Sequence, residues 1–368
     1  MKEILIIRLS SIGDVIHCTP VARSLKMFWP DCKITWLVGE NCAEILSRNP
    51  YIDEIIVWSR EKFEKHLRNF EFGNASLMWK KLRRDLSKRK FFAALDIHGL
   101  FLTGMIAKMV NTKRRIGMSQ ARELNFLFMT QTARSLGKHI TDKYLGVLTP
   151  LGIHSVDHQM VLVVPEEDRR FAKTFLKDRG VFPQEKYAVL IPGTTWSSKN
   201  WPTDFFAQTA QRIYKDFKIV LCGGKAEIEL SEEIQEKAGI RIINAVNQTT
   251  LLQMAGIIEG AAVVISGDTG PLHIAAALEI PTVAVFGPTN PEVYAPIGQK
   301  NAAVFSEMPC SFCHKMKCPR GNASCMTGVT SKEVVDKVYH VLGTKQKILG
   351  REPYKMKKWD RKCPDNVL

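Results

Sequence analysis

Apolar and polar positions along the chain follow two alternating patterns. Short runs of β-branched and other apolar residues, typical of buried strands, alternate with segments whose apolar residues recur every three or four positions, typical of helices. Such alternation favours right-handed βαβ units and parallel sheets. The predicted strands are 3–9, 33–39, 54–58, 92–99, 187–193, 218–224, 241–246, 262–267 and 281–288.

Helical or loop segments follow each predicted strand. Residues 10–15 are expected to form a turn before the first helix. The predicted helices are 16–30, 166–180, 200–217, 225–239, 249–261 and a short one that begins between Gly270 and His273.

The alternation restarts after Pro165, which divides the chain into two sets of strands and helices. A chain of 368 residues is long enough for two domains, each with its own core. The expected fold is therefore α/β, with two Rossmann-like doubly wound domains facing a central cleft. We expect an amino-terminal domain over residues 1–165, a carboxyl-terminal domain over residues 185–343 and a basic tail over residues 344–368.

Polar and glycine-containing motifs come directly after several predicted strands. Open parallel sheets bind ligands beyond the carboxyl ends of their strands. These motifs are therefore expected to line the cleft from both sides. They are residues 10–14 and 96–99 in the first half, and 192–195, 223–224 and 267–270 in the second half.

The segment ISGDTGPLHI, residues 265–274, joins a predicted strand to a predicted helix. A helix that begins at Gly270 presents unpaired N–H groups and the positive end of its dipole, which favours an anion. Thr194, Thr195 and Lys199, on a neighbouring loop, could complete a pyrophosphate clamp. The alternative is structural, with Asp268 and Thr269 capping the helix, His273 a buried histidine and Lys199 a solvated lysine.

Positive charge changes the picture of possible partners. The net charge is +15, and residues 60–92 carry eleven Lys or Arg against four acidic residues, a net of +7. Residues 344–368 carry eight against three, a net of +5. Interleaved aromatic residues suit contact with an anionic surface, although two solvated helical faces would give the same pattern. We find no nucleic-acid-binding motif, so a nucleic-acid binder would rest on charge alone.

The start of the chain, MKEILIIRLSSIGDV, has too short an apolar run for a signal peptide or a membrane span. No other apolar run reaches membrane length. We therefore expect a cytoplasmic protein, in which the nine cysteines are thiols or metal ligands rather than disulfides.

Three motifs carry a family resemblance. RLSSIGDVIHCTP, TTWSSKNWP and SGDTGPLHIAAALEIPTVAVFGPT, in this order, resemble glycosyltransferase family 9, the ADP-heptose–lipopolysaccharide heptosyltransferases. The resemblance covers about residues 1–340. It implies a GT-B fold, an ADP-heptose donor held mainly by the second domain, and inverting transfer to the lipopolysaccharide inner core at the inner face of the cytoplasmic membrane, without a catalytic metal.

The resemblance assigns roles to individual residues. It makes Asp14 the general base; the alternative is that Asp14 caps the helix that follows, and both roles can coexist. Thr194, Thr195 and Lys199 would hold the diphosphate. Lys199 and the helix end after Asp268 would supply the positive charge that replaces a metal during leaving-group departure. Glu227 would contact the adenosine ribose, or be a solvated glutamate. Asp268, Thr269, Gly270 and His273 would contact heptose and phosphate.

Positions on the acceptor side also match the family. Arg122, Glu123 and His139 match positions near the acceptor. Asp96, His98 and Gly99 resemble a DxQG segment, in which His98 stands where glutamine is usual. An anionic, lipid-linked acceptor that carries Kdo or heptose would favour Arg122 and the basic segment 60–92.

Four cysteines form a C-x2-C-x4-C-x6-C run that resembles heptosyltransferases of the second type, whereas TTWSSKNWP and RELNF resemble the first type. A structural zinc site, reduced thiols and a disulfide all fit these spacings. The four are Cys310, Cys313, Cys318 and Cys325.

Other enzymes share this fold class. A dinucleotide-dependent dehydrogenase is the main alternative, but LSSIGD follows the first strand instead of G-x-G-x-x-G. A member of the same family that uses another sugar is a second alternative.

Overall fold

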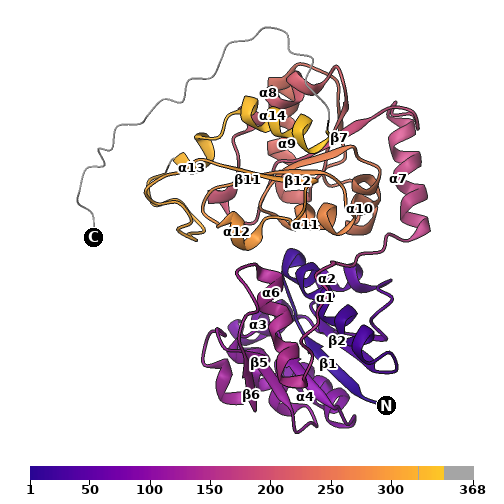
Figure 1. Cartoon of the computed structure of the whole chain (residues 1–368), viewed down its shortest axis with the longest axis vertical. Helices are drawn as coiled ribbons and strands as arrows, with labels where there is room; N and C mark the ends of the chain where they lie inside the picture. Colours follow the sequence, from indigo (N-terminus) through magenta and orange to yellow (C-terminus); the bar gives the residue numbers. More distant parts are fainter. Residues whose placement is uncertain (322, 344–368) are drawn as a thin grey trace.

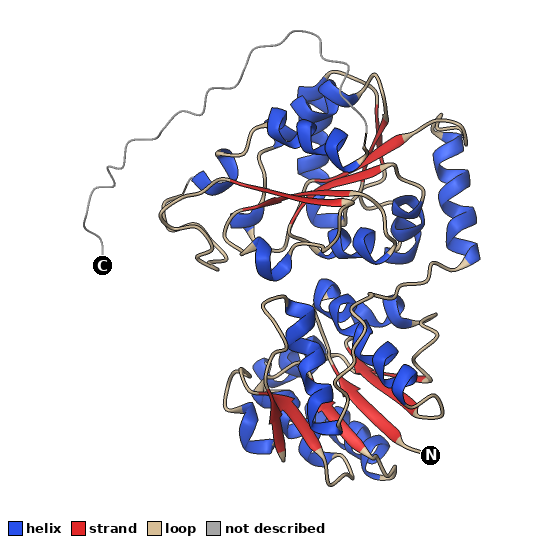
Figure 2. Ribbon diagram, in the orientation of Figure 1, coloured by secondary structure: helices blue, strands red, loops and turns tan. Residues whose placement is uncertain are grey.

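Two α/β units lie one above the other along the long axis of the molecule, each built around one parallel sheet (Figures 1 and 2). The computed structural model describes residues 1–321 and 323–343. The predicted basic tail lies outside the described residues.

The first sheet has six strands in the order β3-β2-β1-β4-β5-β6, and all its pairs are parallel. Its strands are β1 (Glu3–Ile7), β2 (Lys33–Val38), β3 (Glu54–Val57), β4 (Ala93–Asp96), β5 (Arg115–Met118) and β6 (Gln131–Ala133). The helices of this unit are α1 (Ile12–Phe28), α2 (Glu40–Leu46), α3 (Arg60–Arg68), α4 (Phe72–Ser87), α5 (Phe101–Met109) and α6 (Ile140–Leu145).

The second sheet repeats this plan with the order β12-β11-β10-β7-β8-β9. Counted from its own first strand, it has the same strand order as the first sheet. Its strands are β7 (Tyr187–Ile191), β8 (Lys218–Leu221), β9 (Ile242–Asn244), β10 (Val263–Gly267), β11 (Thr282–Phe286) and β12 (Asn301–Phe305). Its α-helices are α7 (Glu166–Asp178), α8 (Thr203–Ile213), α9 (Ile228–Ala238), α10 (Leu251–Glu259), α11 (Gly270–Ala277), α12 (Pro291–Tyr294), α13 (Ser324–Thr327) and α14 (Ser331–Val341).

This architecture confirms the predicted fold class. Every strand predicted from the sequence is present, and both sheets are doubly wound. Hydrophobic cores line both faces of each sheet, as helices on both faces require. The sequence analysis missed β5, β6 and β12, which have three to five residues each and lie toward the outside of their sheets.

One predicted boundary is wrong. Residues 12–15 are helical rather than part of a turn, because α1 begins at Ile12. The Asp14 carboxylate accepts a hydrogen bond from the Ser11 backbone N–H at 3.3 Å, which satisfies a donor at the helix start. Asp14 therefore belongs to the first turn of α1.

The two units contact each other where α1 meets α11. A Cβ atom on Gly13 would lie 2.5 Å from Cδ2 of His273, and one on Gly270 would lie 2.9 Å from Cγ2 of Ile12. Only glycine permits an approach this close at these two positions. Ile16 of α1 and Ile45 of α2 also pack into the core of the second unit.

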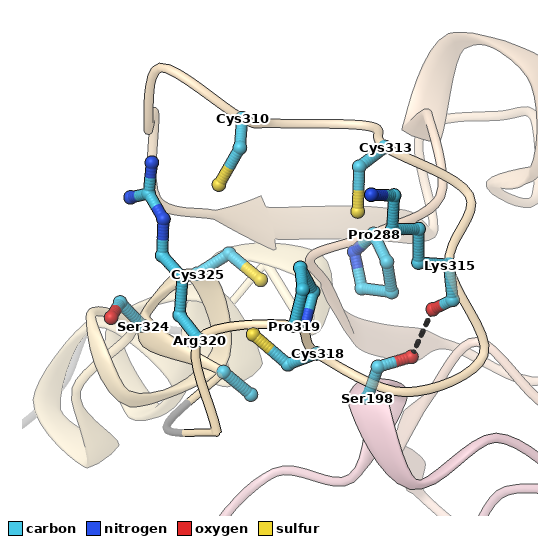
Figure 3. A pocket seen from close by; sticks show the side chains of 11 residues that line it. Ser198, Pro288, Cys310, Cys313, Lys315, Cys318, Pro319, Arg320, Ser324 and Cys325 are labelled. Carbon is cyan, nitrogen blue, oxygen red and sulfur yellow. Dashed lines mark hydrogen bonds between the residues drawn. The ribbon is translucent and has the colours of Figure 1, made fainter. Parts of the chain in front are cut away.

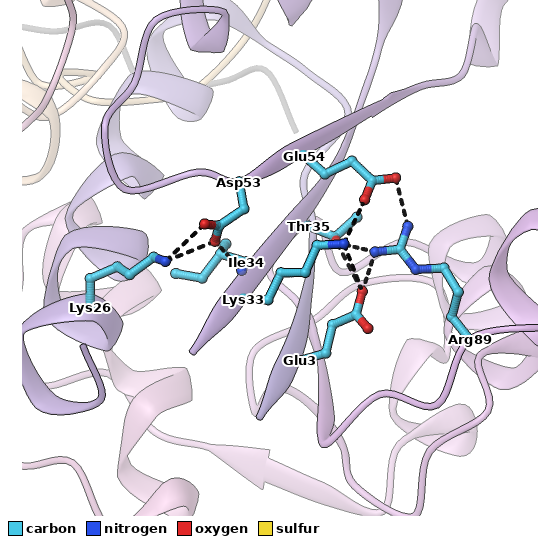
Figure 4. Close-up of polar contacts among 8 residues, drawn as sticks. All are labelled: Glu3, Lys26, Lys33, Ile34, Thr35, Asp53, Glu54 and Arg89. Atoms are coloured by element: carbon cyan, nitrogen blue, oxygen red, sulfur yellow. Dashed lines mark hydrogen bonds and ion pairs between the residues drawn. The ribbon is translucent and has the colours of Figure 1, made fainter. Parts of the chain in front are cut away.

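Ion pairs fasten the first sheet at the ends where its strands begin (Figure 4). Arg89, which follows α4, pairs with Glu3 of β1 and, at 2.7 Å, with Glu54 of β3. Lys33 also reaches Glu54, at 3.2 Å. Arg89 thus holds α4 to the sheet, so part of the basic segment 60–92 has a structural role.

Among the described residues, no helix is both long enough and apolar enough to cross a membrane.

Candidate active site

The predicted motifs gather at two equivalent places in the two sheets. In a doubly wound sheet the ligand crevice lies where the strand order reverses, here between β1 and β4 and between β7 and β10. Residues 10–14 and 96–99 follow β1 and β4, and residues 192–195 and 268–270 follow β7 and β10. Both sets lie at the carboxyl edge, as expected from the sequence.

Asp14 is an ionised carboxylate whose two oxygens have different partners. Oδ2 lies 2.6 Å from the Arg8 guanidinium and accepts the Ser11 hydroxyl at 2.8 Å. Oδ1 accepts the Tyr144 hydroxyl at 2.5 Å. Burial raises the pKa of Asp14, but the Arg8 charge and the hydrogen bonds from Tyr144 and Ser11 outweigh it and hold the pKa well below its usual range.

The two side chains of this ion pair differ in their exposure to solvent. The Arg8 side chain is 9% exposed, whereas that of Asp14 is 30% exposed. Arg8 also donates to the Ile97 carbonyl at 3.0 Å, which ties it to the end of β4. A ligand can therefore reach the carboxylate while Arg8 stays behind it. The structure bears out the helix-capping role of Asp14, and its role as general base stays a prediction.

Asp268 forms a second buried carboxylate on the opposite side. It lies 2.7 Å from the Lys199 ammonium, accepts the Thr289 hydroxyl at 2.7 Å and lies 3.5 Å from Nε2 of His273. Burial raises the pKa of Asp268, but the His273 hydrogen bond and the Lys199 charge outweigh burial and hold the pKa well below its usual range. Thr269 occupies the N-cap position of α11, and no side chain caps that helix. The capping alternative for Asp268 and Thr269 is therefore wrong.

A chain of buried side chains joins Asp268 to the first unit. His273 Nδ1 lies 3.0 Å from His17 Nε2, and His17 Nδ1 lies 3.0 Å from the Thr141 hydroxyl. Burial, followed by the charges of His273 and His139, lowers the pKa of His17 well below its usual value. A neutral His17 can donate from Nε2 to His273 while accepting from Thr141. His273 is thus a buried, hydrogen-bonded histidine that also borders the site.

The donor-side loop folds back on itself beside β10. The Thr194 hydroxyl donates to the Trp196 carbonyl at 2.7 Å, and Lys199 Nζ lies 4.3 Å from the Trp196 ring centroid. A Cβ on Gly267 would lie 3.1 Å from both Thr194 Cγ2 and the Lys199 carbonyl. The structure therefore brings Lys199 and Thr194 to Asp268, while Thr195 is exposed.

Glu227 lies at the end of β8, next to this loop. Its Oε2 accepts the Gly224 N–H at 2.7 Å, and a Cβ on Gly193 would collide with its side chain. Glu227 is half-buried rather than solvated. It therefore lies at the carboxyl edge of the second sheet, and its contact with the ribose stays a prediction.

Some residues expected near the acceptor have partners within the protein, and others are exposed to solvent. Asp96 is fully buried and accepts the His98 and Gly99 N–H groups at 3.1 Å. Burial, with the charges of Arg8 and Arg60, lowers the pKa of His98 to about 3. Glu123 accepts the N–H of Phe101 at 3.2 Å, at the start of α5.

His139 does not offer a free nitrogen. Its Nδ1 accepts the Thr141 N–H at 3.3 Å, and its Nε2 lies 3.1 Å from the Ala295 carbonyl of the second unit. Arg122 is exposed near Lys143 of α6, and the pKa of Lys143 is lowered by burial and then by the charges of Arg122 and Arg8. Among these acceptor-side candidates, Arg122 best fits a contact with an anion.

All four clustered cysteines line one cavity of about 80 Å³, and Figure 3 shows their sulfur atoms turned toward a shared space. The four thiols are free. Within residues 1–321 and 323–343, no group of three or more His, Cys, Asp or Glu side chains is arranged to hold a metal ion, so the zinc alternative gains no support. The same loop braces the donor side, because the Ser198 hydroxyl donates to the Lys315 carbonyl at 2.6 Å.

Several residues of the site were missed by the sequence analysis. Arg8 and Thr289 follow β1 and β11, so inspecting every strand end for polar residues would have found them. His17, Thr141 and Tyr144 lie inside helices, and no pattern in the sequence marks them. The residues missed are Arg8, His17, Thr141, Lys143, Tyr144 and Thr289.

A larger cavity of about 640 Å³ lies beside this site, between the two units. Residues that line it include His139, His158 and Gln159 of the first unit and Ala277 and Lys300 of the second. Neither Asp14 nor Asp268 lines this cavity. The geometry of those two carboxylates, rather than this larger space, defines the candidate site.

Two Rossmann-like doubly wound domains whose switch points face each other have the GT-B architecture. The sequence profile of glycosyltransferase family 9 (heptosyltransferase) matches residues 79–324. The chain belongs to this family.

Known proteins that resemble the chain agree with this assignment. It is 27% identical over 328 residues to lipopolysaccharide heptosyltransferase 1 of Pseudomonas aeruginosa, covering 86% of this chain and 87% of the relative. It matches the glycosyl transferase family 9 structure from Veillonella parvula with a TM-score of 0.81 and 25% identity, covering 93% and 97% of the two chains. The Escherichia coli heptosyltransferase WaaC with ADP matches in fold, with a TM-score of 0.73, 22% identity and coverage of 92% and 99%.

Replacing Asp14 with asparagine should lower kcat by about a hundredfold or more, because general-base catalysis typically contributes this much. The affinity for ADP should remain nearly unchanged, because Asp14 lies opposite the donor side. Arg8 loses its partner in this variant, so thermal unfolding must confirm that the protein is folded at the assay temperature. Near-normal turnover would remove Asp14 from the mechanism.

Replacing Lys199 with methionine should lower kcat and raise KM for the donor, reducing kcat/KM by roughly ten- to a hundredfold. A charged contact to the diphosphate strengthens as negative charge moves onto the leaving group. Lys215→Met, at an exposed lysine of the same unit, is the matched control. A change in KM alone would show that the contact does not strengthen in the transition state.

Replacing Gly13 with alanine should reduce kcat/KM by about tenfold or more, because the new methyl group displaces His273 from its bonds to His17 and Asp268. Steady-state kinetics would measure the loss. Gly73→Ala is the control, since nothing lies within 4 Å of a Cβ at Gly73. Equal activity of the two variants would show that the α1–α11 contact is not needed for catalysis.

Proposed function

We propose that the chain transfers a heptose from ADP-heptose to the inner core of lipopolysaccharide, with inversion at the anomeric carbon. Family membership supports a glycosyltransferase. The named relatives support the heptose and the lipopolysaccharide core, and the WaaC structure with ADP supports the nucleotide. The dehydrogenase alternative has no comparable support.

The observation that carries this proposal is the pair of carboxylates at opposed switch points. Asp14 lies on the first unit and the Lys199–Asp268 pair lies on the second, and the His17–His273 hydrogen bond joins the two. An acceptor on the first unit and a donor on the second would therefore meet beside the α1–α11 contact, where Asp14 and Lys199 lie.

In the proposed mechanism, Asp14 accepts the proton of the acceptor hydroxyl as its oxygen attacks the anomeric carbon. The Asp14 Oδ1 atom receives this hydroxyl at the place where Tyr144 now donates. Asp14 is fully ionised near neutral pH because of Arg8, which makes it available but also a weak base. Proton transfer to Asp14 is therefore completed only in the transition state, when bond formation to the anomeric carbon makes the attacking hydroxyl more acidic.

Positive charge on the second unit stabilises the departing ADP. In this proposal the diphosphate binds beside Lys199 and the N-terminal N–H groups of α11, where its growing negative charge is stabilised. Asp268 holds the Lys199 ammonium in place at the end of β10, and Glu227 contacts the adenosine ribose. These groups supply the charge that a metal would otherwise provide.

The acceptor is an anionic, lipid-linked core oligosaccharide that ends in Kdo or heptose. Arg122 and Lys143 present positive charge on the first unit, beside Arg8. Because such an acceptor is embedded in a bilayer, we place the protein in the cytoplasm, peripherally at the inner face of the cytoplasmic membrane.

Incubation with ADP-heptose and a heptose-free core acceptor tests the reaction itself. Mass analysis should show the gain of one heptose, and core oligosaccharide from a strain lacking the protein should be shorter by that heptose. Transfer from another ADP-sugar, with none from ADP-heptose, would favour a family member with a different donor. If no sugar is transferred from any ADP-sugar to the core acceptor, the proposal is contradicted.

Turnover should survive treatment with EDTA, because Lys199 and the α11 N-terminus provide the charge at the diphosphate. The measurement is the initial rate before and after chelation, followed by addition of Mg²⁺ or Zn²⁺. A loss of rate that Mg²⁺ restores would contradict the proposed mechanism. A loss that accompanies unfolding and is reversed by Zn²⁺ would instead implicate the cysteine cluster.

A further inference from the structure

The hairpin formed by α3 and α4 carries an unusual exposed surface. No residue of α3 is buried, and only Ala75, Leu82 and Leu86 of α4 are buried. At the turn between the helices, Phe70 is 80% exposed and Phe72 is 60% exposed, and Leu77 one turn further on is 66% exposed. We call these three residues the apolar tip.

The backbone of the apolar tip is strained at Phe70. Phe70 has a φ of +59°, in the left-handed region that bulky residues rarely adopt. Its ring contacts that of Phe72, with centroids 6.0 Å apart, and neither ring reaches the core. A strained backbone that presents an aromatic ring to solvent points to a role outside the folding of the chain.

Basic side chains lie on both helices of the hairpin, before and after the apolar tip in the sequence. Lys65, Arg68, Lys80, Lys81 and Arg83, which we call the basic flank, are exposed and form no ion pair within the part of the chain that the structure describes. The acidic residues of α3 and α4 are largely neutralised, since Glu64 pairs with Arg60 and Asp85 with Arg84. The charge of the hairpin is therefore free to act on a partner.

The hairpin is fixed firmly to the acceptor-side unit. Phe63 and Trp79 stack with centroids 5.7 Å apart, and both rings contact Trp58, which is 6% exposed. Arg89 anchors the end of α4 to β1 and β3 (Figure 4). The apolar tip is thus an exposed end of a rigidly held element.

The position of the hairpin relates it to the active site. α3 begins after β3, at the carboxyl edge, and Arg60 lies close enough to His98 to help lower its pKa. α4 has 16 residues, about 24 Å, and ends beside the amino edge of the sheet, so its first turn lies back toward the carboxyl edge. The apolar tip and the candidate acceptor site therefore lie toward the same edge.

From this combination we infer that the α3–α4 hairpin docks the protein on an anionic phospholipid bilayer, with the apolar tip inserted at the interface and the basic flank against the headgroups. Interfacial segments combine apolar insertion with attraction to anionic lipid in this way. The inference rests on the proposed function in one respect, because a bilayer-embedded acceptor explains why docking occurs beside the acceptor site.

Co-sedimentation of the full chain with liposomes tests this inference. Binding to vesicles of phosphatidylcholine and phosphatidylglycerol should exceed binding to pure phosphatidylcholine, and should fall between 0.1 M and 1 M salt as the Debye length shrinks from about 10 Å to about 3 Å. Equal binding to both vesicles, or binding to neither, would overturn the inference.

The variant Phe70→Asn/Phe72→Ser separates docking from folding. Asparagine tolerates the left-handed region, so the Tm should be equal or higher, whereas binding to anionic vesicles should fall at least about tenfold. The control Phe182→Ser/Tyr214→Ser changes two exposed aromatic residues of the second unit and should bind as the wild type does. Unchanged vesicle binding by the Phe70/Phe72 variant would overturn the inference. If the wild type is a dimer in solution and the variant is a monomer that still binds vesicles, the apolar tip is a contact between two copies of the chain, and the inference is also overturned.

A charge variant tests the role of the basic flank. Lys80→Gln/Lys81→Gln/Arg83→Gln should lose most of the preference for anionic over neutral vesicles, with little change in Tm. If the preference persists, the basic flank is not the contact.

Activity assays distinguish this inference from the proposed function. The Phe70→Asn/Phe72→Ser variant should transfer heptose to a water-soluble core acceptor within about twofold of the wild-type rate, and should lose activity mainly toward acceptor embedded in vesicles. If the wild type transfers heptose to neither acceptor, the proposed function fails, while the vesicle-binding result stands by itself.

Discussion

The close approach of α1 and α11 is the constraint on which the active site depends. Gly13 and Gly270 allow the starts of the two helices to touch, and the buried hydrogen bond between His17 and His273 crosses the same contact. Because each helix begins at the switch point of its own sheet, this contact places the reactive ends of both sheets opposite each other. The two cores fold around separate sheets, but catalysis requires their relative placement.

Each carboxylate at this junction is held by a cation. Arg8 lies behind Asp14, and Lys199 lies against Asp268, at 2.6 Å and 2.7 Å. Paired charges of this kind tolerate burial, whereas either one alone would be costly. In the proposed mechanism, a diphosphate would compete with Asp268 for Lys199, and an acceptor hydroxyl would compete with Tyr144 for Asp14. Substrate binding would thus replace these internal contacts with contacts to the ligand.

Local patterns in the sequence predicted nine of the twelve strands that the structure describes and most of the motifs at their carboxyl ends. Periodicity finds β-branched strands, and topology then brings Lys199 and Asp268 together although 69 residues separate them. The contact between His17 and His273 spans 256 residues and lies between domains, so no local pattern shows it. His139 was expected beside the acceptor, but both its ring nitrogens have protein partners, which only the packing of α6 against the second unit reveals.

Opposed placement of Asp14 and Lys199 is the central claim, and its most direct consequence is stereochemical. A base on one side and a charge clamp for the leaving group on the other require attack from the face opposite ADP. Proton NMR of the product, through the coupling constant or nuclear Overhauser contacts of the transferred anomeric proton, measures this. Our account predicts inversion relative to the ADP-sugar, and retention of the anomeric configuration would contradict it.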